Sequence, residues 1–308
     1  MELFTTPNIN FAKLNKPILM FALTLVVLCV GLVITIGLTY GIDFLGGTAI
    51  ELRFEQNLEI ADVRTALSQV GFGEAEIKTL GSPNEILIRV QEQESGTEIS
   101  DAIKAELTKA FPENPYSVQM VEKVGPKIGA ELRSDAMWAI LVSAFTIMMY
   151  IWWRFKSLIS GVGALAALFF DVMITLAIFS ILQLEISLSV IAAFLTIVGY
   201  SINDKIVVYD RIRENLKILR RETYENLVNI SINQTLSRTV LTGGTTLMVL
   251  IVLFVFGGDV IHNFSLALLL GIIIGTYSSM FVATPIIVEW HNRRHTKRSG
   301  LAAKVTVN

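Results

Sequence analysis

Six long apolar runs divide the sequence, and polar or charged residues bound each of them. They cover residues 17–40, 136–153, 158–182, 187–208, 239–256 and 264–288. A helix rises about 1.5 Å per residue and the hydrocarbon core of a bilayer is about 30 Å thick, so each run is long enough to cross it. The first run is too long for a signal-peptide core and lacks a small-residue cleavage site. The pattern predicts a polytopic protein with six membrane-spanning helices.

A polar stretch, residues 42–134, separates the first two spans, and its hydrophobic spacing changes along its length. Period-two alternation predicts strands at residues 48–54, 75–80, 85–90 and 116–124. Helical spacing predicts helices at residues 58–70 and 98–111, and Gly81 to Asn84 (GSPN) predict a turn. The order βαββαβ is that of a small ferredoxin-like α+β domain. Because the stretch contains no nucleophile–base pair, phosphate loop or metal cluster, a binding or lever role is favoured.

Composition supports a membrane protein and narrows its chemistry. Hydrophobic residues make up 53% of the chain, mean hydropathy is +0.59, and only 17% of residues are charged. A formal net charge of −2 does not indicate nucleic-acid binding. The single cysteine, Cys29, lies in an apolar run and the three histidines lack ligand spacing, so neither a disulfide framework nor a metal site is predicted. No cofactor is expected.

Basic residues are concentrated in alternate connections between the spans. They are Lys13, Lys16, Arg154, Lys156, Arg211, Arg213, Lys217, Arg220, Arg221, Arg238, Arg293, Arg294, Lys297 and Arg298, whereas residues 183–185 and 257–263 contain none. Since Lys and Arg favour the cytoplasmic side, both termini are expected there. The expected domains are a cytoplasmic N-terminus with the first span (1–41), an extracytoplasmic α+β domain (42–134), a five-span bundle (135–290) and a cytoplasmic tail (291–308).

Two carboxylates interrupt the apolar runs. Asp204 lies in residues 199–215, GYSINDKIVVYDRIREN, with hydrophobic sequence on both sides. A charge in hydrocarbon costs about 3 kcal/mol or more, so such a residue is a candidate for function. Counting along the spans places Asp171 near the middle of its span and Asp204 about 10 Å to the inner side of its midpoint, at ~1.5 Å per residue. Depth alone favours Asp171 over Asp204 as the proton carrier. The alternatives for Asp171 are a second relay group and an acceptor for span-4 hydroxyls.

Arg238 opens the fifth predicted span and is the candidate counter-charge for Asp204. Its helical face carries a polar stripe that is unusual on a membrane helix: Ser231, Thr235, Thr242, Thr245 and Thr246. The simplest arrangement sets spans 4 and 5 side by side, with Arg238 facing Asp204. Protonation of Asp204 would then release the arginine, and deprotonation would recapture it. The alternative is a static pair that joins two helices, although a buried pair is weak evidence for net stability.

Four stretches resemble the SecF family. Residues 41–47, GIDFLGG, resemble the GIDFxGG signature shared by SecD and SecF, and residues 199–215 are similar to the fourth span specific to SecF. Residues 124–129, VGPKIG, and 236–239, LSRT, also look like SecF. The resemblance covers nearly the whole chain, and the length suits a separate SecF rather than a fused SecDF.

The resemblance implies an accessory subunit of the bacterial Sec translocase in the inner membrane. Together with SecD it would use the proton-motive force to complete protein translocation after the ATPase SecA has acted. The implied partners are SecD, the SecYEG channel, YajC, YidC, the translocating preprotein, protons and the lipid bilayer. The implied fold is half of an RND-type transporter, with six spans from each subunit.

The family also implies roles for single residues. Its IND carboxylate and the arginine after the 4–5 loop transport protons, which implies this role for Asp204 and Arg238, with Asp171 as a further candidate. Many relatives carry His before this last aspartate, where this chain has Phe170. The supporting motif residues are Gly199, Tyr200, Ser201, Asn203, Asp210 and Arg211, of which the last two are expected to cap span 4 at the headgroups. A hinge beside the outer domain is expected from Gly41, Asp43, Gly46 and Gly47.

Two other functions fit parts of the sequence. A half-transporter that exports a small molecule or lipid would need a pocket in the outer domain or between subunits, and the small domain offers no obvious one. An intramembrane aspartyl protease could use Asp171 and Asp204, but no GxGD motif surrounds them and Arg238 would keep Asp204 ionised. The favoured function is a proton-driven transport subunit that is not an enzyme.

Overall fold

The computed structural model describes residues 9–11, 15–80, 82–91 and 96–293. Of the residues named above, Lys13, Gly81 and the tail beyond Arg293 lie outside these ranges. The chain forms two compact units. The membrane unit consists of Met1–Leu38, Ile140–Leu184 and Val190–Asn308, and the outer unit consists of Thr39–Ala139 and Glu185–Ser189.

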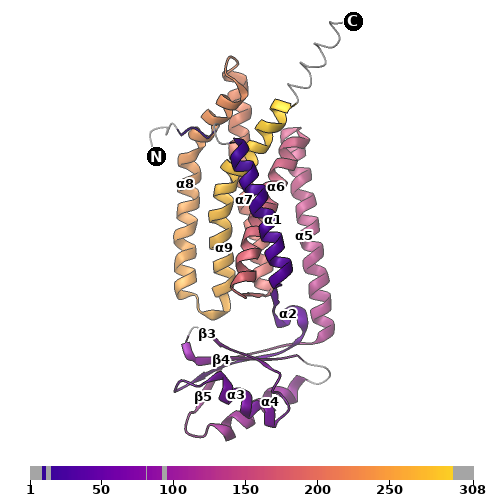
Figure 1. The fold of residues 1–308 in the computed structure, drawn as a ribbon, viewed down its shortest axis with the longest axis vertical. Helices are drawn as coiled ribbons and strands as arrows, with labels where there is room; N and C mark the ends of the chain where they lie inside the picture. The colour runs from indigo at the N-terminus through magenta and orange to yellow at the C-terminus, as the bar shows by residue number, and fades with distance from the viewer. Residues whose placement is uncertain (1–8, 12–14, 81, 92–95, 294–308) are drawn as a thin grey trace. The chain divides into compact units, whose positions relative to one another are not determined.

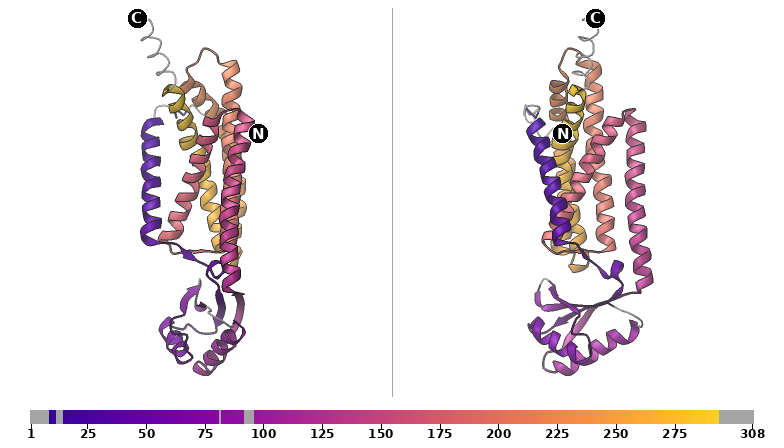
Figure 2. Two further views of the ribbon diagram at one scale, coloured as in Figure 1. Left: turned by 90° about the vertical axis from the view of Figure 1, so that its right-hand side faces the viewer. Right: turned by 45° about the vertical axis from the view of Figure 1, so that its right-hand side comes forward.

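Six helices in the described residues are long and apolar enough to cross a membrane, which confirms the predicted number of spans. They are α1 (Asn15–Ile36), α5 (Pro126–Phe155), α6 (Leu158–Ile181), α7 (Leu188–Ile218), α8 (Tyr224–Phe256) and α9 (Asp259–Ser278). After α9 a π-helical segment, η2 (Ser279–Ala283), continues into helix that reaches Arg293. In the membrane unit α1 packs beside α6 and α8 packs beside α9 (Figures 1 and 2).

Four helices extend beyond the predicted apolar runs, and among them α9 begins five residues before its run. α5 begins ten residues earlier than predicted, α7 ends ten residues later, and α8 begins at Tyr224 rather than at residue 239. Hydropathy marks only the part of a helix that lies in hydrocarbon, whereas backbone hydrogen bonding continues until a cap ends it. At α8 the Thr223 hydroxyl is that cap, accepting from the backbone N–H of Asn226 at 3.3 Å. α1 instead ends before the predicted position, because Gly37 adopts φ +84° and its N–H bonds to the Val33 carbonyl at 3.1 Å.

Glycines on α9 allow it to pack closely against α7. A Cβ at Gly275 would lie 2.8 Å from Ser201 Oγ, and one at Gly271 would overlap the Ile197 side chain. Small residues commonly let membrane helices approach in this way. The small-xxx-small pattern of α9 therefore serves a contact inside this chain, and it brings the end of α9 close to the polar part of α7.

The outer unit contains a four-stranded antiparallel sheet in the order β3-β4-β2-β5. Its elements are β2 (Gly47–Phe54), α3 (Ile60–Gln69), β3 (Glu76–Leu80), β4 (Ser82–Val90), α4 (Gly96–Ala110) and β5 (Tyr116–Val124). The register pairs Ile50 with Ile88 on one side and with Val121 on the other. The βαββαβ order and this strand order give the ferredoxin-like α+β fold that the sequence predicts.

Alternating side chains of the sheet form the core of the outer unit against α3 and α4. Ile50, Leu52, Ile86 and Ile88 are fully buried and belong to one hydrophobic cluster with Val63, Leu67, Ile103 and Leu107 of the two helices. Each such side chain contributes about 1.5–3 kcal/mol by leaving water. Helices α3 and α4 lie along one face of this sheet (Figure 2).

A short parallel pair, β1 (Thr39–Tyr40) with β6 (Glu185–Ile186), joins distant parts of the chain within the outer unit. The sequence did not predict it, because two-residue strands leave no periodic pattern. As a result, the residues that begin α7 belong to the outer unit, whereas most of α7 belongs to the membrane unit.

Candidate functional site

A buried ion pair joins the middle of α6 to α7. Lys205 Nζ lies 3.0 Å from Asp171 Oδ2, and both side chains are 0% exposed. The ammonium also donates to Ser201 Oγ at 2.5 Å and to Ser278 Oγ at 3.1 Å, so all three of its protons have acceptors. Ser201 Oγ in turn donates to Asp171 Oδ2 at 2.6 Å. Two opposite charges and two hydroxyls thus form one closed network inside the membrane unit.

The local structure of three helices places these groups together. Ser201 and Lys205 are four residues apart on α7, which puts them on one face. Ser278 is the last residue of α9 before the π-helical segment η2, a local distortion that often accompanies functional sites. Gly275, one turn earlier, leaves room for Ser201, since an added Cβ there would lie 2.8 Å from the hydroxyl oxygen.

The sequence prediction included Asp171 and Ser201 but not Lys205. Lys205 directly follows Asp204, has the opposite charge and lies about 100° further around the helix at 3.6 residues per turn, so it faces a different neighbour. The signal was present, because Lys205 follows Ser201 by four residues and so lies on the same face of the helix. Asp171 accepts a hydrogen bond from the Ser201 hydroxyl, which agrees with its predicted role as an acceptor for span-4 hydroxyls. Its ion pair with Lys205 was not predicted.

Asp204 is buried without such a network. Its residue is 2% exposed, and its Oδ2 atom has no hydrogen-bond partner in the described structure. Asp171 Oδ1 is likewise unpartnered. A buried polar atom left without a partner typically costs about 1–3 kcal/mol, and more if it is charged. Both carboxyl groups consequently retain an oxygen that could accept a proton or a water molecule.

The predicted direct contact between Asp204 and Arg238 is not formed in the described residues. Helices α7 and α8 are in contact beyond the predicted spans, where Asn215 Nδ2 of α7 donates to Ser231 Oγ and Gln234 Oε1 of α8, both at 2.8 Å. However, Arg238 is exposed and no ion pair joins it to Asp204 in the part of the chain that the structure describes. α8 begins fifteen residues before the predicted span, so Arg238 lies inside a long helix rather than at its start.

The hydroxyl groups of the polar stripe on α8 donate mainly to backbone carbonyls of the same helix. Thr242, Thr245 and Thr246 each donate to a carbonyl four residues earlier, at 3.0 Å, and Ser231 and Thr235 bond to α8 carbonyls in the same way. Two links cross to α7: Thr246 Oγ1 donates to Tyr200 Oη at 3.5 Å, and Ser231 Oγ accepts from Asn215 Nδ2 at 2.8 Å. The stripe therefore contributes little to the surroundings of Asp204.

The other residues of the fourth-span motif point in three directions. Tyr200 and Ser201 face inward, whereas Gly199 and Asn203 are exposed. Asp210 and Arg211 do not cap the helix, which continues to Ile218. Instead, Asp210 pairs with Arg154 of α5 at 2.8 Å, and Arg211 Nε donates to Gln234 of α8 at 2.7 Å. These two side chains tie α7 to its neighbours because the helix persists through the polar sequence.

The GIDFLGG segment forms a tight connection within the outer unit. Gly46 and Gly47 adopt φ values of +74° and +135°, a backbone conformation that glycine adopts without steric cost. Gly41 N–H bonds to the Ile186 carbonyl at 2.9 Å, and Asp43 Oδ2 accepts from the backbone N–H of Leu188 at 2.7 Å. Leu188 is the first residue of α7, so Asp43 caps that helix from 145 residues away in sequence.

Arg89 adds an ionic contact beside this connection. It pairs with Glu185, and with Glu76 at 3.6 Å, while its side chain is only 11% exposed. Burial lowers the pKa of the Arg89 guanidinium, while the carboxylates of Glu76, Glu122 and Asp43 act in the opposite direction. The start of α7 is thus held to the sheet of the outer unit by both a hydrogen-bonded cap and a cation.

Comparison with known proteins gives consistent matches. Residues 102–293 match the family described as "Protein export membrane protein SecD/SecF, C-terminal", and residues 31–57 match the "SecD/SecF GG Motif". The chain is 47% identical over 266 residues to protein translocase subunit SecF of Desulfurispirillum indicum, covering 84% of each chain. It is 42% identical over 304 residues to that of Rhodothermus marinus, covering 97% of this chain and 98% of the relative.

The fold is also similar to a solved membrane protein. The crystal structure of SecDF from Thermus thermophilus, a translocon-associated membrane protein, superimposes with a TM-score of 0.84 at 44% identity. The match covers 93% of this chain and 39% of that one, so this chain spans about two fifths of SecDF.

Proposed function

The chain belongs to the SecF family of protein translocase subunits, and on that premise we propose that it uses the proton-motive force, together with a SecD partner, to complete protein export after the SecA step. Its relatives are named as translocase subunits, and the chain is a multi-pass membrane protein of the same length and fold. In this proposal it is a transport subunit rather than an enzyme.

We place the chain in the bacterial inner membrane with both termini in the cytoplasm. The distribution of Lys and Arg supports this orientation, since they are concentrated around the α7–α8 connection and absent from residues 257–263. The outer unit then lies on the side where the exported chain emerges.

The observation that carries the proton role is the buried network of Asp171, Lys205, Ser201 and Ser278. A proton that reaches Asp171 neutralises it and removes the attraction to Lys205, whose ammonium then keeps only its two hydroxyl acceptors. Loss of that proton restores the pair. Each cycle therefore alternates the strength of one contact between α6 and α7. One proton crossing 100 mV releases about 2.3 kcal/mol, which is enough to bias such a contact but not to unfold a bound protein.

Asp204 and Arg238 provide a second group on the same route. Asp204 directly precedes Lys205, is buried, and has an unpartnered oxygen that could accept a proton. We propose that Asp204 and Asp171 exchange protons through water or through a rearrangement of α7, with Arg238 as a long-range counter-charge. Repeated small cycles of this kind would prevent the exported chain from sliding backwards.

The movement would reach the outer unit through α7. This helix carries Asp204 and Lys205 and begins at Leu188, whose backbone is capped by Asp43 of the GIDFLGG segment. We propose that the segment transmits motion of α7 to the ferredoxin-like domain, which then acts on the exported chain as a lever. Gly41, Gly46 and Gly47 would supply the hinge around this connection.

A SecD subunit is the proposed partner, and the exposed face of α7 supports it. Ala192, Thr196, Gly199 and Asn203 are all exposed and share one helical face. Small residues and an amide are typical of contacts between membrane helices, whereas a lipid-facing surface is usually apolar. The SecYEG channel, YajC and YidC are proposed as further partners, and the translocating preprotein as the substrate.

The test is a reconstitution in proteoliposomes with SecYEG, SecA and an exported protein. Addition of the chain together with SecD should raise the yield of fully translocated protein when a proton gradient is present. Addition of either subunit alone should leave the yield of translocated protein at the level obtained with SecYEG and SecA only. An equal stimulation by the chain without SecD, or with the gradient collapsed, would contradict the proposal.

A further inference from the structure

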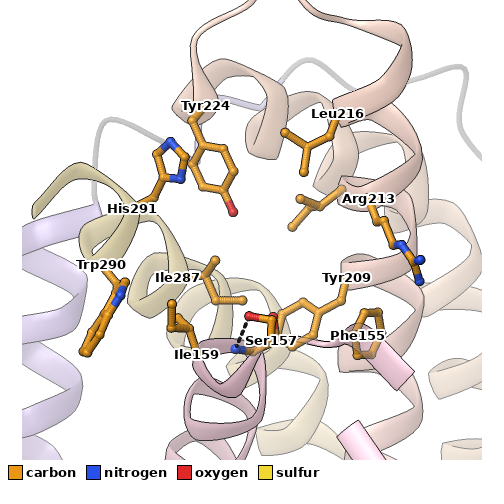
Figure 3. Close-up of a pocket in the computed structure, with 12 residues that line it drawn as sticks. Phe155, Ser157, Ile159, Tyr209, Arg213, Leu216, Tyr224, Ile287, Trp290 and His291 are labelled. Carbon is orange, nitrogen blue, oxygen red and sulfur yellow. Dashed lines mark hydrogen bonds between the residues drawn. The ribbon is translucent and has the colours of Figure 1, made fainter. Parts of the chain in front are cut away.

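A cavity of about 270 Å³ opens at the end of the membrane unit where α7 connects to α8. Five helices line it: the end of α5, the first turn of α6, the last three turns of α7, the first residue of α8 and the last turns of the helix that follows α9 (Figure 3). It lies one helical turn beyond Lys205 along α7 and belongs to none of the groups discussed above. Its polar lining includes Ser157, Ser160, Tyr209 and Tyr224.

The Tyr209 hydroxyl is the feature that points to a ligand. Tyr209 is 4% exposed, and its Oη atom has no hydrogen-bond partner in the described structure. The ring is held by an edge-on contact with Phe155, with 5.6 Å between the centroids, and it points towards Ser157 (Figure 3). Buried hydroxyl groups are nearly always hydrogen-bonded. An acceptor atom inside the cavity would satisfy this one.

The first turn of α6 supplies further donors. Ser157 caps this 24-residue helix by accepting from the Ser160 N–H at 3.3 Å, and the backbone N–H groups of Leu158 and Ile159 have no intrahelical acceptor. The start of a helix is also the positive end of its dipole, which favours an anion. Tyr209 Oη and the start of α6 therefore offer donors to the same space.

The charges around the cavity also favour an anion. No carboxylate occurs among the described residues that line it, and Arg213 is part of its wall, where its guanidinium donates to the Arg154 carbonyl at 3.4 Å. The nearest acidic residues along α7 have their own cations: Asp210 pairs with Arg154, and Glu214 pairs with Arg211. Trp290, another wall residue, is of a type enriched where membrane meets water, which places the cavity at headgroup depth.

We propose that this cavity binds a phosphate group, delivered by the headgroup of an anionic membrane lipid. Tyr209 Oη and the backbone N–H groups at the start of α6 would donate to the phosphate oxygens, and Arg213 would add positive charge at the rim. Ile159, Ile212 and Ile287 give the remaining wall an apolar surface suited to the glycerol and upper acyl chain. Basic pockets between membrane helices are known to hold lipid headgroups in this way.

The test measures thermal unfolding of the full chain in phosphate-free detergent micelles. A short-chain phosphatidylglycerol, inorganic phosphate and a diacylglycerol without phosphate are titrated separately against wild type, Tyr209→Phe and the control Tyr277→Phe. Phosphatidylglycerol should raise the Tm of wild type and Tyr277→Phe, with a half-saturating concentration at least tenfold higher in Tyr209→Phe. Without ligand, Tyr209→Phe should unfold at or above the wild-type Tm, because an unpartnered hydroxyl has been removed.

The three titrations distinguish the possible sources of the phosphate group. An equal shift with inorganic phosphate would support the site and assign it to the free anion, whereas a shift with phosphatidylglycerol alone assigns it to lipid. An equal shift with diacylglycerol, an undiminished shift in Tyr209→Phe, or no shift in any arm would overturn the proposal. The phosphorus content of protein purified from membranes provides a second readout, and it should fall in Tyr209→Phe relative to wild type.

Discussion

Replacing Lys205 by Met leaves Asp171 as a buried carboxylate without its cation. The two charged atoms are 3.0 Å apart, and at an effective dielectric constant of about 20 this corresponds to an attraction of about 5.5 kcal/mol. The cost of removing both groups from water offsets much of this attraction in the intact pair. Loss of one partner is nevertheless expensive, typically about 3–5 kcal/mol. We expect Lys205→Met to lower the free energy of unfolding by an amount in this range.

The assay is equilibrium unfolding in mixed micelles, with Lys217→Met as the matched control on the same helix. Lys217 is exposed, so its replacement should change the free energy of unfolding by less than about 0.5 kcal/mol. Asp171→Asn and the double variant Asp171→Asn/Lys205→Met complete a double-mutant cycle. The double variant should be less destabilised than the sum of the two single variants, with a coupling of about 2 kcal/mol or more, because the orphaned charge is then absent.

Infrared spectroscopy tests the same reasoning independently. In Lys205→Met at neutral pH, Asp171 should take up a proton, which adds a protonated-carboxyl band that Asp171→Asn removes. If Lys205→Met were no less stable than Lys217→Met and no such band formed, Asp171 and Lys205 would not form a charged pair in the wild-type protein.

Three further substitutions test separate contacts. Asp43→Ala removes the cap of α7 and should cost about 1 kcal/mol, seen as roughly fivefold faster hydrogen exchange in the first turn of that helix; unchanged exchange would show that the cap is dispensable. Gly275→Ala forces a Cβ to within 2.8 Å of Ser201 Oγ and should cost about 1–3 kcal/mol in thermal unfolding, whereas Gly244→Ala, with no atom within 4 Å, should be neutral or stabilising. Arg89→Met should destabilise the outer unit by about 3 kcal/mol in chemical unfolding, and Lys78→Met, an exposed partner of Glu76, by no more than about 1 kcal/mol; equal effects would refute the distinction between buried and exposed pairs.

The spacing of hydrophobic residues was sufficient to predict most of the fold. The outer unit could be predicted because its strands alternate, with Ile50, Leu52 and Phe54 on one face, and because its connections are short. The spans could be counted because each contains a long apolar run. The ends of α5, α7 and α8 could not be predicted, since a helix continues through polar sequence as long as its backbone remains hydrogen-bonded.

The candidate site was predicted only in part, for a different physical reason. Sequence distinguishes a buried charge from an exposed one poorly, and it does not show which way a side chain faces across helices. Arg238 seemed the natural counter-charge for Asp204, yet it is exposed, while Lys205 is fully buried against Asp171. The motif positions shared with SecF include Asp204 and Arg238, whereas the pairing of Lys205 with Asp171 depends on how α6, α7 and α9 pack together.

If protonation of the buried carboxylates drives late export, the step that follows removal of SecA should depend on them. Translocation into membrane vesicles is started with SecA and ATP, SecA is then removed, and completion is followed with and without a proton gradient. Wild type and the control Asp135→Asn, an exposed residue, should complete translocation only with the gradient. Asp204→Asn and Asp171→Asn should insert normally but lose the gradient-dependent fraction. Completion at the wild-type level in both variants would contradict the account.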